Sequence, residues 1–99
     1  MAQLNDGMLR DRRAEGGTRG RFEREEAGAV SFADYRVEGG RIVIEHVETP
    51  AAARGGGAAG RLMAAIVARA QSEHRTLVPE CGYAAAWMAR RLSREAPEG

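Results

Sequence analysis

Residues 41–62 read RIVIEHVETPAAARGGGAAGRL, and this stretch decides the fold. Its first part, residues 41–49, favours a β-strand because residues 42–44 are three consecutive β-branched apolar residues. Such a run is typical of a central strand that is covered on both faces. Pro50 cannot donate to a strand ladder, so it ends the strand. The glycine-rich loop Arg54–Gly60 then leads into a helix that the apolar periodicity predicts over residues 61–74.

The rest of the chain supplies more strands and one more helix. We expect an edge strand over residues 20–26, a strand over 29–37 with a bulge near Ala33 and Asp34, a short strand over 76–79 and a second helix over 83–92. The strand–helix–strand unit requires its two strands to be parallel, whereas the tight turn at residues 38–40 joins antiparallel strands. The expected fold class is therefore α/β in the broad sense, specifically α+β: a compact domain with a mostly antiparallel sheet and two main helices.

Length and composition limit the class of protein. The 99 residues suit one domain, which we place at residues 18–93, after a flexible segment over 1–17 and before a frayed tail over 94–99. All 15 basic residues are arginine and the net charge is +1, so we expect no nucleic-acid partner. The chain has one cysteine, no apolar signal core at its N-terminus and no apolar run that could span a membrane. We therefore expect a cytoplasmic protein without a membrane partner.

The glycine-rich loop has the composition of an anion cradle. The first amides of a helix lack intrahelical partners and carry partial positive charge, and glycine allows a phosphate to approach the backbone closely. Arg54 and Arg61 flank the loop and can add charge-assisted contacts. A lysine-dependent phosphate loop is excluded because the chain has no lysine. A dinucleotide fold is excluded because the loop follows antiparallel strands and 99 residues hold no second βαβ unit. A helix-starting linker without a ligand is the simpler alternative.

Three sequence segments, the loop among them, together indicate a more specific function for the loop. They are Ile42–Pro50, Arg54–Leu62 with its R-x-x-G-x-A pattern, and Val78–Tyr83, which reads VPECGY. In this order and spacing they resemble the GNAT N-acetyltransferase superfamily, and more specifically its small YjdJ-type branch. The resemblance covers residues 22–91 and implies a GNAT-like fold with a strand–loop–helix acyl-CoA site.

The resemblance also implies a cofactor and the residues that bind it. The cofactor is acetyl-CoA, with its pyrophosphate on the amides of residues 55–60 and its pantetheine arm beside a strand that splays from its neighbour over residues 45–49. No metal is implied. The expected cofactor-binding residues are Val47, Thr49, Arg54, Gly55, Gly56, Gly57, Ala58, Ala59, Gly60 and Arg61.

Three residues are candidates for catalysis: His46, Glu48 and Cys81. Imidazole suits a general base near neutral pH, and strict alternation would place His46 on the face that carries Ile42 and Ile44. Glu48 and Glu45 are alternative bases. Cys81 precedes the second helix and is either a nucleophile that takes the acetyl group or a small buried apolar residue.

The function that we expect is transfer of an acetyl group from acetyl-CoA to an amine. The amine could belong to a small molecule, a peptide or a protein, and a second copy of the chain could complete an open acceptor pocket. Trp87 falls where many GNAT enzymes place a tyrosine acid, and we expect it to pack in the core instead. The alternative function is a CoA-binding or protein-interaction module with little or no catalysis.

Overall fold

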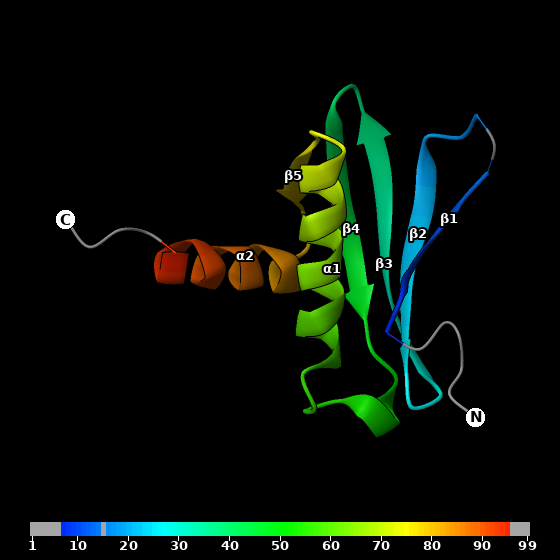
Figure 1. Cartoon of the computed structure of the whole chain (residues 1–99), viewed down its shortest axis with the longest axis vertical. Coiled ribbons are helices and arrows are strands. Elements are labelled where there is room, and N and C mark those ends of the chain that lie inside the picture. The colour runs from blue at the N-terminus through cyan, green and yellow to red at the C-terminus, as the bar shows by residue number, and fades with distance from the viewer. Residues whose placement is uncertain (1–6, 15, 96–99) are drawn as a thin grey trace.

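The computed structural model describes residues 7–14 and 16–95, which form one five-stranded sheet and two α-helices (Figure 1). In chain order the elements are β1 (Leu9–Arg13), β2 (Arg19–Glu26), β3 (Ala29–Glu38), β4 (Arg41–Glu48), a 3-10 turn (Ala51–Ala53), α1 (Ala58–Ser72), β5 (Thr76–Pro79) and α2 (Gly82–Glu95). The strands lie in the order β1-β2-β3-β4-β5. The first four are antiparallel and β5 runs parallel to β4, so the expected α+β fold is confirmed.

Strand β1 corrects two expectations. Residues 9–13 lie within the segment expected to be flexible, and they pair with β2 from Leu9–Arg24 to Arg13–Gly20. The edge of the sheet is therefore β1, and the strand over residues 19–26 is internal. The apolar pattern missed β1 because four of its five residues are charged. Residues 1–6 and 96–99, which belong to the expected flexible ends, lie outside the described residues.

One face of the sheet carries the hydrophobic core. Helix α1 runs along this face (Figure 1) and buries Leu62, Met63 and Ile66 completely. These side chains pack with residues of β2, β3 and β4, among them Phe22, Ala33, Tyr35, Ile42 and Ile44. Burial of each large side chain stabilises the fold by about 1.5–3 kcal/mol. The second helix begins beside α1 and runs away from it at a steep angle (Figure 1), and Ala84 of this helix is fully buried.

A bulge in β4 changes which residues share a face. Tyr35 of β3 lies opposite Ile44 and Asp34 lies opposite His46, so Glu45 is an extra residue in β4. The sequence predicted a bulge near Ala33 and Asp34 in β3; the register does shift after Asp34, but the extra residue belongs to β4. The sequence did not predict the consequence: Ile42 and Ile44 join the core, whereas the His46 ring lies beside Phe32 on the other face, with ring centres 6.1 Å apart. The expectation that His46 shares the face of Ile42 and Ile44 is therefore wrong.

The helix after the glycine loop begins three residues earlier than expected. The first backbone bond of α1 joins the N–H of Arg61 to the carbonyl of Gly57 at 3.0 Å, and the helix runs from Ala58 to Ser72. Gly57 caps it with φ +86°, a left-handed conformation that glycine adopts without penalty. Alanine favours helix strongly, so the residues after this cap extend the helix into the loop.

Candidate functional site

The strand–loop–helix connection encloses a hollow of about 340 Å³ at the N-terminus of α1. The chain leaves β4, forms the short 3-10 turn and reaches the glycines in a fixed path: the N–H of Arg54 donates to the carbonyl of Ala51, and its Nε donates to the carbonyl of Thr49 at 3.1 Å. The Thr49 hydroxyl is in turn hydrogen bonded to Ser31 in the interior, at 3.2 Å. The loop is therefore anchored to the sheet on its β4 side.

The first turn of α1 supplies backbone donors to this hollow. The amides of Ala58, Ala59 and Gly60 precede the first intrahelical bond, and all three residues line the hollow. No acidic side chain lies in the first turn of α1. The positive end of the helix dipole is thus not neutralised from within the helix, which favours an anionic ligand.

The two arginines that flank the loop have different roles. Arg54 lines the hollow, whereas the guanidinium of Arg61 lies outside it. Arg61 makes a two-pronged contact with the Glu26 carboxylate, with Nε–Oε2 at 2.9 Å and Nη2–Oε1 at 2.8 Å, and it donates to the carbonyl of Gly56 at 2.8 Å. Arg61 therefore holds the outer side of the loop against the β2–β3 turn.

Seven of the ten predicted cofactor-binding residues line the hollow: Thr49, Arg54, Gly55, Gly57, Ala58, Ala59 and Gly60. Gly56, Arg61 and Val47 do not, and the Val47 side chain packs against the core. Two residues that were not predicted, Ala53 and Tyr83, also line it. Tyr83 stands in the third sequence segment, so its place in that motif was the signal that could have found it.

Tyr83 reaches the hollow because α2 approaches α1 closely at Gly60. A Cβ at Gly60 would lie 3.2 Å from Nε1 of Trp87 and 3.8 Å from the Tyr83 hydroxyl oxygen. Trp87 packs against the core, as expected. Burial raises the pKa of the Tyr83 phenol, so its hydroxyl keeps a proton and can donate to a ligand in the hollow.

Strands β4 and β5 part beside the hollow. Their register ends at Ile44 opposite Pro79, and the carbonyl of Ile44 accepts the N–H groups of both Glu80 and Cys81, at 2.9 and 3.3 Å. Residues 45–48 of β4 continue beyond this fork, paired with β3 from His46 onward.

Arg36 bridges the two branches of the fork on the face opposite α1. It donates to Glu45 at 2.8 Å and to Glu80 at 2.7 and 3.0 Å. Its hydrogen bonds lower the pKa of the Glu80 carboxyl. Glu45 also accepts from Arg19 at 2.7 Å, so its carboxylate is committed to two cations and suits a general base poorly.

The fork separates the candidate catalytic residues. His46 and Glu48 lie on the open face, about half exposed, with His46 Nε2 3.8 Å from a Glu48 carboxylate oxygen. Cys81 lies on the core side, where its thiol sulfur accepts the N–H of Ala84 at 3.3 Å and its carbonyl accepts that of Ala85 at 3.0 Å. Cys81 thus caps α2. The structure brings His46 and Glu48 together, and it places Cys81 on the other branch.

The described part of the chain holds neither a cluster of metal-binding side chains nor a membrane-spanning helix. Over residues 7–14 and 16–95, no group of three or more histidine, cysteine or acidic side chains is arranged to hold a metal ion. Neither helix in these ranges is long and apolar enough to cross a membrane.

The arrangement is that of an α+β domain in which a glycine-rich loop and a helix N-terminus line a hollow, and two parallel strands part after Ile44 and Pro79. A family model described as GCN5-related N-acetyl-transferase matches residues 21–95. The chain therefore belongs to the GCN5-related N-acetyltransferase family, which supports acetyltransferase activity in general and whose members generally use acetyl-CoA. No curated protein matches the chain.

Proposed function

We propose that this protein is an acetyl-CoA-dependent N-acetyltransferase that passes the acetyl group directly to an amine, and that it belongs to the small YjdJ-type branch of its family. The observation that carries the proposal is the cradle at the N-terminus of α1 beside the fork between β4 and β5. The three sequence segments supply the strand, the loop and the start of α2 that frame this cradle and fork.

The residues of the hollow fit a pyrophosphate. The amides of Ala58, Ala59 and Gly60 are backbone donors at the positive end of a helix, and Arg54 adds a guanidinium to the lining. The Tyr83 hydroxyl faces the same hollow and is a further donor. Arg61 and Gly56, which are outside the lining, hold the shape of the loop instead of touching the ligand.

The fork suits the reacting end of the same ligand. When bound, acetyl-CoA supplies a thioester, whose acyl group is activated toward attack by an amine. Residues 45–48 of β4, and Thr49 after them, run past the last pair with β5, so their backbone can receive the pantetheine arm, and a backbone N–H near Val47 or Glu48 can donate to the acyl oxygen. His46, with Glu48 beside it, is the base that we propose for the acceptor amine.

The two sides of the sheet then have different tasks. The cradle and Cys81 lie on the α1 side, whereas His46 and Glu48 lie on the open face. An acceptor that approaches from the open face reaches the base before the thioester. In the described residues no helix lies over this face (Figure 1), which fits the amine of a peptide or protein better than that of a small molecule.

The cofactor is tested by calorimetric titration with acetyl-CoA, CoA and NAD. We expect micromolar binding of acetyl-CoA and CoA and no binding of NAD. Arg54→Gln should weaken acetyl-CoA binding about tenfold, the cost of about one charge-assisted hydrogen bond. Arg41→Gln is the matched control, because Arg41 is an exposed arginine at the opposite end of β4. Absence of acetyl-CoA binding to the folded wild-type protein would overturn the proposal.

The reaction is tested by release of free CoA in the presence of peptide amines. His46→Gln should lower the rate of transfer and leave acetyl-CoA affinity unchanged, because His46 lies outside the hollow. If acetyl-CoA binds and no amine accelerates CoA release, the alternative of a CoA-binding or interaction module replaces the enzyme.

A covalent route through Cys81 gives a different result. In that route the thiol of Cys81 attacks the acetyl carbonyl, CoA leaves as its thiol and the chain gains an acetyl thioester of about 42 Da. The chain has no lysine, so a side-chain acetyl amide cannot mimic this adduct. Full activity of Cys81→Ala would support the direct transfer that we propose.

A further inference from the structure

The hollow at the N-terminus of α1 has room for only part of the proposed cofactor. Its volume of about 340 Å³ lies near the lower end of the range of about 300–1,000 Å³ for pockets that enclose a drug-sized ligand, and CoA is larger than such a ligand. In the proposed function the cradle takes the pyrophosphate and the fork takes the pantetheine arm. The nucleotide end of CoA, which carries a phosphate on the 3′ carbon of its ribose, therefore leaves the hollow and meets the surface at its rim.

On the side of the β2–β3 turn, the rim of the hollow is already neutralised. The guanidinium of Arg61 and the carboxylate of Glu26 form their two-pronged ion pair there, at 2.8 and 2.9 Å. Arg61 also donates to the carbonyl of Gly56, so its guanidinium is committed to contacts within the protein. A ligand phosphate on this side would meet the Glu26 carboxylate, and like charges so placed oppose binding.

Helix α2 forms another side of the rim and brings an arginine to it. Tyr83 lines the hollow, and Nε1 of Trp87 would lie 3.2 Å from a Cβ at Gly60, so the side of α2 with Tyr83 and Trp87 faces the first turn of α1. Arg90 follows Tyr83 by seven residues, which is about two helical turns, so it lies on the same side of α2. Side chains of a helix lean toward its N-terminus, so the Arg90 side chain leans toward Tyr83.

The electrostatics of this side of α2 suit an anion. Arg90 is exposed, and within residues 7–14 and 16–95 no hydrogen bond or ion pair engages its side chain. Burial raises the pKa of the Tyr83 phenol and the charge of Arg90 opposes that rise, so the guanidinium acts at the position of the phenol that lines the hollow. The sequence of α2 contains no acidic residue before Glu95. A phosphate on this side therefore meets a cation and no carboxylate of α2.

We propose that Arg90 binds the 3′-phosphate of the CoA ribose and so makes the protein select CoA over dephospho-CoA, which lacks that phosphate. The proposal rests on the proposed function, because it concerns the same ligand. The nucleotide end would leave the hollow past Tyr83 and lie along the α2 side of the rim, where a guanidinium can form charge-assisted hydrogen bonds to a phosphate. The thioester lies at the other end of the ligand, so Arg90 acts on binding and not on acyl transfer.

The test is calorimetric titration of the full chain with CoA and with dephospho-CoA at low ionic strength. The wild type should bind CoA about fivefold more tightly, as for a well-formed ion pair at an exposed position, and added salt should reduce this preference. Arg90→Gln should abolish the preference by weakening CoA alone, and Arg90→Glu should reverse it. Equal affinity of the wild type for the two ligands would overturn this proposal and leave the proposed cofactor standing. Binding of neither ligand would overturn both.

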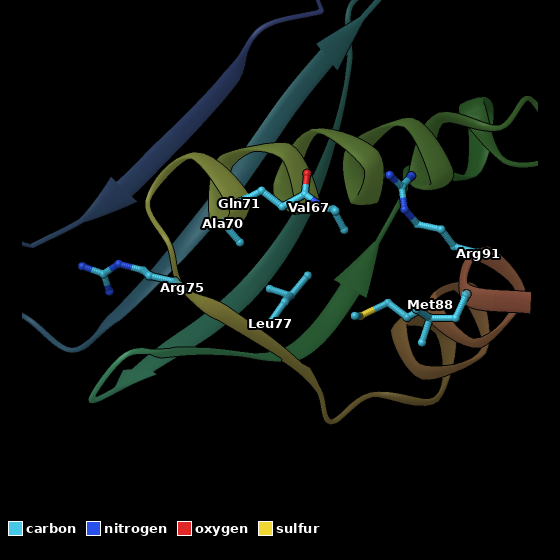
Figure 2. A pocket seen from close by; sticks show the side chains of 8 residues that line it. Val67, Ala70, Gln71, Arg75, Leu77, Met88 and Arg91 are labelled. Atoms are coloured by element: carbon cyan, nitrogen blue, oxygen red, sulfur yellow. The ribbon is translucent and has the colours of Figure 1, made fainter. Parts of the chain in front are cut away.

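Arg91→Gln is the matched control. It removes the same charge from the next residue of α2, but Arg91 lines the separate hollow between α1, β5 and α2 (Figure 2). Urea unfolding shows whether each variant is folded. An equal loss of the CoA preference in Arg90→Gln and Arg91→Gln would mean that the charge of α2 acts only at long range, contrary to the proposal.

The transfer assay gives a second measurement. With acetyl-CoA as the donor, Arg90→Gln should raise KM about fivefold and leave kcat unchanged, because a distant phosphate is bound equally in the ground state and the transition state. A fall in kcat with an unchanged KM would place Arg90 in the acyl transfer itself and would overturn the proposal.

Discussion

At Gly57, the effect of a substitution on the stability of the backbone can be measured separately from its effect on binding of the proposed ligand. Its φ of +86° lies in the left-handed region, which costs an alanine about 1–2 kcal/mol. A Cβ there would also lie 2.9 Å from Nη1 of Arg61, at the end of a flexible side chain that can move. Because that side chain can yield, we expect Gly57→Ala to lose about 1–2 kcal/mol of unfolding free energy and to remain folded.

The same substitution tests the cradle. Gly57 lines the hollow, so an added methyl group holds a phosphate away from the amides behind it. Loss of one charge-assisted hydrogen bond is worth about 1.5–3 kcal/mol, so acetyl-CoA affinity should fall at least about tenfold. Urea unfolding gives the change in unfolding free energy. Calorimetric titration of the folded variant at 25 °C gives the change in acetyl-CoA affinity.

Two further variants separate strain from occlusion. Gly56→Ala is the matched control: Gly56 does not line the hollow, its φ is not positive and its Cβ would meet only the carbonyl of Ala53, at 3.7 Å. It should change stability by less than about 0.5 kcal/mol and leave affinity unchanged. Gly57→Asn should recover part of the stability, since asparagine tolerates this conformation, and still bind weakly. Wild-type affinity in both Gly57 variants would refute the cradle.

Three other predictions concern the core and the cap of α2. Burial and a hydrogen bond to Asp11 raise the pKa of the Tyr35 phenol, so the stability that the neutral phenol contributes is complete below pH about 10 and is lost as the pH rises toward the folded pKa, by up to about 1.4 kcal/mol per pH unit. Tyr35→Phe should remove this pH dependence of the unfolding free energy in urea titrations. The same pH dependence in the variant and the wild type would contradict the assignment. A Cβ at Gly20 would lie 2.6 Å from the Tyr35 ring, so Gly20→Ala should lower the unfolding free energy by about 1–3 kcal/mol. As a control, Gly40→Ala, whose Cβ meets open space, should change it by less than about 0.5 kcal/mol. Equal urea midpoints for the two variants would show that the Tyr35 ring moves freely. Cys81→Ala should lower the unfolding free energy by about 1 kcal/mol, measured by thermal or urea unfolding. Cys81→Ser should lower it much less, because a serine hydroxyl can still accept the N–H of Ala84 in the first turn of α2. Identical losses in the two variants would mean that the cap contributes nothing.

The sequence predicts the centre of this fold well because local and global preferences agree there. Residues 42–44 are β-branched and apolar where the sheet is most buried, and the apolar stripe of α1 has the helical period that its burial requires. The parallel pairing of β4 and β5 follows from the helix that connects them. Seven of the ten predicted cofactor residues line the hollow because the loop joins two well-predicted elements.

Strand β1 could not be predicted from an apolar pattern. It is held by its ladder with β2 and by ion pairs such as Arg10–Glu23 at 3.3 Å and Arg12–Glu23 at 3.0 Å. Charged residues on an edge strand also discourage pairing with another chain, which is a property of the whole sheet. The information that makes residues 9–13 a strand therefore lies in the partner strand.

The predicted sheet face of His46 was wrong for a different reason. Strict alternation holds only while the ladder is regular, and one extra residue at Glu45 reverses the face of every later side chain in β4. The bulge is stabilised from outside β4, by the ion pairs of Glu45 with Arg19 and Arg36. Those partners belong to β2 and β3, so the local sequence of β4 cannot reveal the bulge.

The same bulge gives the proposed chemistry its geometry. Without it, His46 would point to the core side of the sheet, against α1, and an imidazole there would be desolvated and shut off from an acceptor. With it, His46 lies on the open face with Glu48, while the cradle and Cys81 remain on the side of the helices. The fork between β4 and β5 is then the connection between the two sides, and Arg36 braces it through Glu45 and Glu80. In the proposed function, the thioester would lie on one face and the amine would arrive from the other, because a single inserted residue in β4 places His46 on the face opposite Cys81 and α1.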